Sequence, residues 1–359
     1  MVILDFTGMF AADSKAITAS AVGTPRNERG DSWKAIIEPI DPFLQSVSDR
    51  LTRQVTTFEP DLTPYAEYAL NGTGKHLRPA LVALTANAVG KEVDDSHITV
   101  AVIIEMVHLA TLVHDDVMDE AEIRRGRLTL AANWGNEIAV LFGDCLFAQA
   151  LKLAASFPTP EICRAVAMAT NTVCSGEILQ TQHRRDFELS REKYFKILEM
   201  KTAELFALSC ELGSCLSGTT AEHRTALRQF GLAFGTAYQV HDDCIDLFGS
   251  EASEGKSLGT DLAKGKLTLP ILLVWERADA KDRARLKDLV QRWETSSIEQ
   301  ISDLLLKYEA LNASIKIVHQ YLEQSRRILR TLPASTGRNS LLGLTEFLAH
   351  QTNALGDTA

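Results

Sequence analysis

Residues 114–126 read HDDVMDEAEIRRG and follow an apolar run from Ile98 to Val113. On a helix, Asp115 and Asp119 are four residues apart and share one face, while Asp116 is turned about 100° away. Two carboxylates roughly 5 Å apart repel by about 3 kcal/mol at an effective dielectric constant near 20, so a compensating charge is needed. The spacing indicates either a site for a hard cation such as Mg²⁺ or a solvated acidic helix end.

The composition favours one large all-helical domain. The chain has 359 residues with 45% hydrophobic content, and most of its ten prolines lie near the expected ends of elements. Long segments rich in Ala, Leu, Glu and Ile lack the alternation of strands, so we expect an all-α fold. Residues 1–30 are small, polar and mixed, and we expect them to form a mobile tail before a domain over 31–359.

Charge and cysteine usage exclude several classes of protein. The net charge is -10 with no Lys/Arg-rich block, so we expect no nucleic-acid partner. No apolar run reaches the roughly 18 residues of a membrane span, and the N-terminus lacks the basic start of a signal peptide. The six cysteines form neither a CxxC pair nor a zinc spacing, which is typical of reduced, mostly buried thiols in a cytoplasmic protein.

A glycine-rich basic segment precedes the acidic one. Residues 71–79 read NGTGKHLRP, in which Lys75 and Arg78 supply two cations before Pro79 opens a helix. This pattern is compatible with a diphosphate-binding loop and equally with a plain basic loop, and it lacks the spacing of a Walker loop.

Polar residues also interrupt apolar helices and therefore need partners. Glu105 and His108 precede the acidic segment, and Lys201–Thr202 lies in a later apolar helix. A lysine there either snorkels, pairs with a carboxylate or binds a phosphate. For a further set we expect structural hydrogen-bond networks: Asn136, Asp144, Glu177 and Gln180.

The acidic spacing occurs a second time. Residues 239–249 read QVHDDCIDLFG, so Asp242, Asp243 and Asp246 repeat the i, i+1, i+4 pattern at the end of another apolar helix. A glycine-rich loop follows, with Lys256, Lys264 and Lys266, and such a loop can close over a site and bring cations to phosphates. Two such motifs favour the metal interpretation over an acidic surface.

Together these segments resemble the trans-isoprenyl diphosphate synthase (polyprenyl synthetase) family, in particular its long-chain, octaprenyl- or solanesyl-type members. The match runs from about Asn71 to Pro270 and includes, in family order, GKHLRP, DDVMDEAEIRRG, GNEIAVLFGD, GEILQ, KTAELF, YQVHDDCIDLFG and GKSLGTDLAKGKLTLP. The resemblance implies a single all-α bundle around a central cavity, a homodimer, and Mg²⁺ bridging an allylic diphosphate to both aspartate motifs. Thr73, Leu128 and Tyr238 depart from the family pattern, but none removes a charged ligand.

The resemblance also implies roles for matching residues. Metal ligands are expected at Asp115, Asp119 and Asp242, with Asp116, Asp243 and Asp246 in support. The allylic diphosphate, farnesyl or geranylgeranyl, is expected to bind Arg124, Lys201, Lys256 and Lys266, helped by Thr202 and Gln239. Isopentenyl diphosphate is expected to bind Lys75, Arg78, His108 and Arg125. The residues expected to act in ionisation, condensation and elimination are Asp115, Asp119, Asp242, Lys201, Arg124 and Lys266.

Product length is expected to depend on the helix before Asp115. At about 1.5 Å per residue, Thr111, Val107 and Ile104 lie roughly 6, 12 and 16 Å before it, with Ala110 beside the first. In the family a bulky aromatic one turn before the motif stops the chain at farnesyl length, whereas Ala110 and Thr111 are small. We therefore expect a long polyprenyl product, with geranylgeranyl as the alternative, transient membrane contact for its release, and a cavity floor at Phe142 or Phe147.

Two other classes share some of these features. A class I terpene cyclase has one such aspartate motif, but its second metal site is of another type. A non-catalytic subunit of a heteromeric prenyl synthase is expected to have lost an aspartate or arginine, and here both motifs are whole. Turnover by the isolated chain distinguishes these alternatives.

Overall fold

The structure is a computed structural model and describes residues 28–70, 74, 76–249, 258–294 and 296–356. The described residues are almost entirely helical, which confirms the all-α prediction. Their only strands are β1 (Ile123–Arg124) and β2 (Arg127–Leu128), an antiparallel pair directly after the first aspartate motif. The first helix already begins at Glu28, three residues inside the predicted tail, and the rest of that tail lies outside the described residues.

The helices follow one another through short connections. They are α1 (Glu28–Ile37), α2 (Asp41–Gln54), α3 (Thr63–Leu70), α4 (Leu77–Ala88), α5 (Asp95–Met118), α6 (Leu130–Trp134), α7 (Asn136–Ala155), α8 (Glu161–Gln182), α9 (Arg191–Leu198), α10 (Glu204–Leu216), α11 (Ala221–Phe248), α13 (Thr260–Ala263), α14 (Leu269–Arg277), α15 (Ala280–Gln291), α16 (Ser297–Lys307), α17 (Ala310–Arg330) and α18 (Thr336–Gly356). A five-residue π-helix, Glu199–Ala203, joins α9 to α10.

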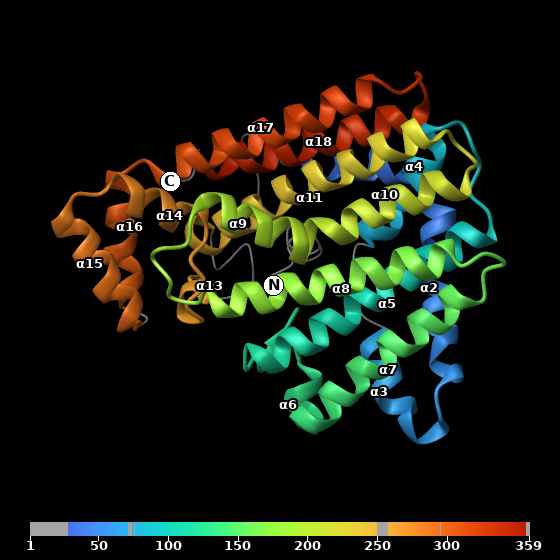
Figure 1. Ribbon diagram of the computed structural model, residues 1–359, viewed down its shortest axis with the longest axis horizontal. Helices are drawn as coiled ribbons and strands as arrows, with labels where there is room; N and C mark the ends of the chain where they lie inside the picture. The colour runs from blue at the N-terminus through green and yellow to red at the C-terminus, as the bar shows by residue number, and fades with distance from the viewer. Residues whose placement is uncertain (1–27, 71–73, 75, 250–257, 295, 357–359) are drawn as a thin grey trace, which may run out of the picture.

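The long helices pack as a bundle around α5, α10 and α11. Helix α5 lies against α7, α4 and α10, and α11 lies between α10 and α17. In Figure 1, α17 and α18 run along one side of the molecule, whereas α3, α6 and α7 form the opposite side and α15 and α16 one end. Because α5 and α11 both carry an aspartate motif, their central positions bring both motifs inside the bundle.

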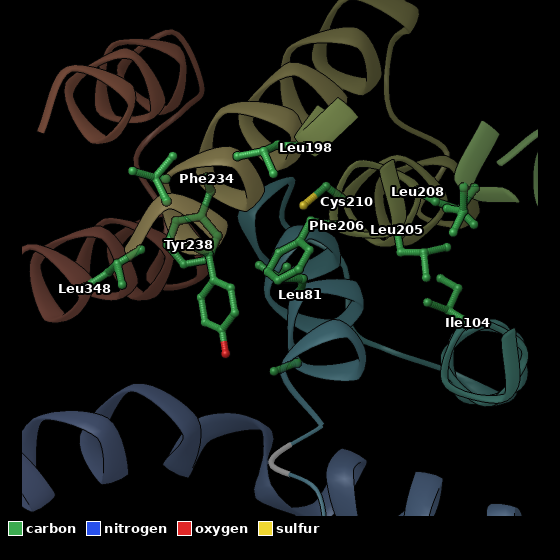
Figure 2. Packing of buried hydrophobic residues seen from close by; sticks show 14 of the residues in the cluster. Leu81, Ile104, Leu198, Leu205, Phe206, Leu208, Cys210, Phe234, Tyr238 and Leu348 are labelled. Carbon is green, nitrogen blue, oxygen red and sulfur yellow. The ribbon is translucent and has the colours of Figure 1, made fainter. Parts of the chain in front are cut away.

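Helices α4, α10 and α11 meet in an apolar core. Figure 2 shows Leu81, Phe206 and Tyr238 from these three helices around one contact, where the Phe206 and Tyr238 ring centroids are 5.3 Å apart. Each such side chain contributes roughly 1.5–3 kcal/mol by burial. Gly235 allows the close approach of α11 to α10, since a Cβ there would lie 2.8 Å from the Ala203 Cα. This contact brings α11 against the π-helix that carries Lys201.

Helix α5 begins at Asp94, one of the three predicted N-caps. The Asp94 carboxylate accepts hydrogen bonds from the backbone N–H groups of Ser96 and His97, at 2.9 and 3.2 Å. The helix then runs without a break to Met118, and Asp119 is its C-cap. The first motif is thus presented at the end of a rigid helix.

Two helices, α5 and α7, are long and apolar enough to cross a membrane by length and composition. Their most apolar windows are 72% and 39% buried inside the protein, and core helices of water-soluble proteins pass the same test. The search for an unbroken apolar run did not detect α5, because Glu105 and His108 interrupt it. All six cysteines are free thiols, but only Cys210 and Cys244 are buried, so the expectation of mostly buried cysteines is wrong.

Candidate active site

The first aspartate motif lies at the end of α5 and is surrounded by cations. Asp115 and Asp116 are both about 5% exposed. The Arg124 guanidinium, on β1, donates from Nε and Nη2 to Asp116 Oδ1 at 2.7 Å. Lys201 Nζ is 3.9 Å from Asp115 Oδ2. The compensating charge that the spacing requires is therefore supplied here by the chain's own cations.

Asp119 is contacted by three cations. Lys266 Nζ is 2.8 Å and Lys264 Nζ 3.3 Å from Oδ2, and Arg184 Nη2 donates to Oδ1 at 3.0 Å. Burial raises the pKa of the Asp119 carboxyl, but the neighbouring ammonium groups, Lys266 first, outweigh burial and hold this pKa well below its usual range. The carboxylate is therefore ionised and strongly attracts positive charge.

Lys201 is held between α8 and the first motif. Its side chain is 5% exposed, and its ammonium pairs with Glu177 and donates to Gln180 Oε1 at 2.7 Å. Gly176 is required for this approach, because a Cβ there would lie 2.7 Å from the Lys201 backbone N. The π-helix at Lys201 is a local widening of the kind often found at functional sites. The polar residues Glu177 and Gln180 thus position this lysine.

The second motif is buried in the last turns of α11. Asp242, Asp243 and Asp246 are 2%, 3% and 1% exposed. Asp243 accepts hydrogen bonds from the Tyr194 hydroxyl and from Gln239 Nε2, the latter at 2.9 Å, and Gln239 also accepts from the Thr202 hydroxyl at 2.9 Å. These donors are neutral, unlike those around the first motif.

Asp246 connects α11 to the loop that follows it. Its Oδ1 accepts from the Thr260 backbone N and hydroxyl at 3.1 and 2.7 Å, and its Oδ2 accepts from the Asp261 backbone N at 3.1 Å. Burial raises the pKa of Asp243, and the carboxylates of Asp261 and Asp242 raise it further. The second motif therefore favours a proton or another cation at Asp243, since its carboxylates repel one another.

The metal-binding prediction depends on whether these residues fit a divalent cation. The described part of the chain contains no group of three or more His, Cys, Asp or Glu side chains already arranged to hold a metal ion. The donors are nevertheless hard carboxylate oxygens, and Asp115, Asp116 and Asp119 all bind positive charge in this structure. The residues fit Mg²⁺ once the lysine and arginine side chains exchange for it.

A second group of charged side chains lies around Gly74. A Cβ on Gly74 would be 3.2 Å from Arg125 Nη1. His76 Nδ1 is 3.4 Å from Glu105 Oε1, and Arg78 is stacked over the Phe206 ring at 4.8 Å. The structure therefore brings two predicted isopentenyl diphosphate ligands, Arg78 and Arg125, to Glu105.

His108 belongs to the same group. Burial lowers its pKa well below the usual value, and Arg78 and Arg125 lower it further, so the imidazole is neutral. Among the described residues, His108 Nδ1 and Arg78 Nε are buried without a hydrogen-bond partner, which is costly unless a ligand binds them. Two predicted ligands, Lys75 and Lys256, lie outside the described residues.

A cavity of about 320 Å³ extends from the first motif between α5, α7 and α8. Asp115, Glu177 and Lys201 are the charged side chains of its wall. Its other lining residues are mainly apolar: Thr111, His114, Val117, Met118, Val140, Phe147, Val173, Cys174 and Ile178. Gly143 leaves room for His114, since a Cβ there would lie 2.3 Å from His114 Nε2.

The predicted product-length residues fall into two groups. Thr111 and Phe147 line the cavity. Ala110 and Val107 are buried in the core and do not line it. Phe142 packs against Phe58, with ring centroids 5.5 Å apart, so it faces away and cannot be the floor. The helical period placed α7 correctly but did not fix which of its two phenylalanines faces α5.

Sequence reasoning missed two residues that contact the site. Arg184 reaches Asp119 from the segment between α8 and α9, and Tyr194 reaches Asp243 from α9. The HRRD sequence at 183–186, close behind GEILQ, is a signal that could have drawn attention to Arg184.

Comparison with known proteins agrees with this geometry. A family model described as polyprenyl synthetase matches residues 59–307. Octaprenyl diphosphate synthase of Haemophilus influenzae is 31% identical over 305 residues, which cover 85% of this chain and 92% of that protein.

Solved structures are similar over nearly the whole described chain. A decaprenyl diphosphate synthase from Rhodobacter capsulatus superimposes with a TM-score of 0.83 at 28% identity, covering 89% of this chain and 99% of that one. A polyprenyl synthase from Caulobacter crescentus, complexed with calcium and isoprenyl diphosphate, gives 0.80 at 30% identity, covering 89% and 97%. With its two aspartate motifs and their cations inside an all-α bundle, this chain belongs to the trans-isoprenyl diphosphate synthase (polyprenyl synthetase) family and is a trans-polyprenyl diphosphate synthase.

Proposed function

We propose that this synthase condenses isopentenyl diphosphate with an allylic diphosphate in a Mg²⁺-dependent reaction and extends the product to a long trans-polyprenyl diphosphate of the octaprenyl or solanesyl class. One observation carries the proposal. The cations and carboxylates of the first motif lie at an apolar cavity whose wall contains both Asp115 and Thr111. A diphosphate bound by these cations would direct its hydrocarbon chain into that cavity.

The charged residues supply the electrostatic part of the reaction. Breaking the allylic C–O bond places negative charge on the leaving diphosphate, and Arg124, Lys201 and Lys266 stabilise that charge as it develops. Mg²⁺, when bound to the aspartates, supplies further positive charge to the same oxygens. In the structure described, each of these cations pairs with a carboxylate, so substrate binding requires them to exchange partners.

The group around Gly74 binds the second substrate in this proposal. Arg78 and Arg125 bind the isopentenyl diphosphate, and His108 contributes a neutral imidazole. The unpartnered atoms Arg78 Nε and His108 Nδ1 then gain a partner. Holding the isopentenyl double bond beside the allylic carbon provides much of the rate by proximity, and the released diphosphate accepts the final proton.

Product length is tested directly by assay. Purified protein is incubated with Mg²⁺, isopentenyl diphosphate and farnesyl diphosphate, and the products are sized by chromatography. We expect chains well beyond farnesyl, because Met118, Val140 and Ile178 line the cavity and are also 42%, 40% and 59% exposed, so the cavity continues to the surface. A geranylgeranyl product would support the alternative, and nothing longer than farnesyl would contradict the proposal.

Two substitutions on α5 refine the length assignment. Thr111→Phe fills the cavity below Asp115 and is expected to shorten the product without abolishing turnover. Ala110→Phe places the same ring in a fully buried position outside the cavity, where overpacking costs about 1–3 kcal/mol. If Ala110→Phe shortens the product and Thr111→Phe does not, the assignment of Thr111 is wrong.

We also propose a cytoplasmic homodimer that contacts membranes only to release its product. Support comes from α7 and α8, whose outer faces carry exposed apolar side chains: Val140, Leu141, Leu151, Met168 and Ile178. Such a cluster is typical of a protein interface. Light scattering of the purified chain, compared with Leu141→Lys, tests the dimer, and cell fractionation tests the location.

A further inference from the structure

Arg184 lies on the segment between α8 and α9 and reaches into the site. Its side chain is 27% exposed, and Nη2 donates to Asp119 Oδ1 at 3.0 Å. The next residue fixes the segment to the lysine-bearing loop, because the Arg185 backbone N donates to the Gly265 carbonyl at 2.6 Å. Arg184 and the loop that carries Lys264 and Lys266 are thus held together on one side of Asp119.

The charges around Asp119 do not balance locally. One carboxylate faces Arg184, Lys264 and Lys266, with its oxygens 3.0, 3.3 and 2.8 Å from their nitrogens. Like charges at such separations repel by several kcal/mol at an effective dielectric constant near 20. A surplus of cations around one carboxylate is expected where an anionic ligand completes the site.

The three cations differ in what they can bind instead of Asp119. Lys266 Nζ has a second carboxylate, Asp261, at 3.7 Å. Arg184 has Asp119 as its single carboxylate partner within the part of the chain that the structure describes, and its Nε is buried without a hydrogen-bond partner. A divalent cation on Asp119 would therefore leave Arg184 with two unsatisfied donor positions on one edge of its guanidinium.

That edge suits a phosphate. Nε and Nη2 of a guanidinium form a planar pair of donors that binds two oxygens of one phosphate group. We propose that Arg184 is a further diphosphate-binding residue, which occupies Asp119 in the metal-free site and transfers to the allylic diphosphate when a divalent cation takes that carboxylate. The inference rests on the proposed function for the identity of the ligand.

The test uses the full chain, calorimetry and two probes. Arg184→Gln removes the charge at the site, and Arg185→Gln removes the same charge from the exposed neighbouring side chain. With Ca²⁺ or Mg²⁺ alone, Arg184→Gln is expected to bind metal several-fold more tightly, since its competitor is gone. With inorganic diphosphate in saturating Mg²⁺, it is expected to bind about 10- to 100-fold more weakly, as loss of a charged hydrogen bond implies.

Opposite shifts for the two probes separate this role from a structural one. A merely structural arginine would weaken both, and a general field effect would appear equally in Arg185→Gln. If Arg184→Gln does not fold, Arg184→Lys keeps the charge without the paired donors and is expected to weaken diphosphate binding several-fold.

Prenyl transfer is assayed separately on the same proteins. Absence of elongation by the unmodified chain would overturn the proposed function and leave the binding result intact. Unchanged diphosphate affinity in Arg184→Gln, or an equal loss in Arg185→Gln, would overturn the role of Arg184 even in an active synthase.

Discussion

The two aspartate motifs have the same spacing but opposite surroundings. At the end of α5, Asp116 and Asp119 are bound by arginine and lysine side chains from other elements. On α11, Asp243 and Asp246 are bound by neutral donors, namely the Tyr194 hydroxyl, the Gln239 amide and groups of Thr260. The first motif therefore holds charges that can exchange, whereas the second also holds the local structure together.

The pKa directions express the same difference. Positive neighbours, Lys266 first, overcome the effect of burial and lower the pKa of Asp119, while burial and the carboxylate of Asp261 raise that of Asp243. Identical sequence patterns can thus have different electrostatic roles, because the helix they occupy and the elements packed against it decide which partners are available.

The largest expected effect concerns catalysis at the first motif. Asp119→Asn removes the charge that attracts the cations and the expected metal, and we expect turnover to fall by about 10²–10³-fold. Steady-state prenyl transfer at saturating Mg²⁺ measures it. Asp49→Asn, an exposed carboxylate on α2, is the control and should change turnover little. A loss below tenfold in Asp119→Asn would show that this carboxylate is dispensable.

At the second motif the leading effect is on stability. Asp246→Ala leaves the donors of Thr260 and Asp261 unsatisfied inside the protein, and we expect the free energy of unfolding to fall by roughly 3–5 kcal/mol. Urea unfolding of the metal-free protein measures this loss, and hydrogen exchange at the Thr260 amide locates it. An equal destabilisation by Asp119→Asn would remove the distinction between the motifs.

A smaller effect is expected from Tyr194. Tyr194→Phe removes the hydroxyl that donates to Asp243 but keeps the ring, and we expect a loss of about 1–2 kcal/mol in the free energy of unfolding. Tyr65→Phe, whose ring packs on Trp134, provides a matched control. If both substitutions have the same effect, the Tyr194 hydroxyl does not stabilise the second motif.

Local patterns in the sequence were sufficient for the helices and the motifs. The apolar period predicted an all-α fold, Asp94 was among the predicted caps, and the spacing of Asp115 and Asp119 placed both at one helix end. These features depend on residues within a few positions of one another, which is why composition and periodicity reveal them. The family resemblance rests on the same short segments.

Tertiary structure alone decided the partners of those residues. Phe147 rather than Phe142 lines the cavity, the π-helix presents Lys201 to Glu177, and Arg184 reaches Asp119 across 65 positions of sequence. Each depends on how closely two elements approach, as at Gly176, where a single Cβ would lie 2.7 Å from the Lys201 backbone N. The sequence determined the helices and their charges, and the packing between helices determined which charges meet, because those distances are set by side chains far apart in the chain.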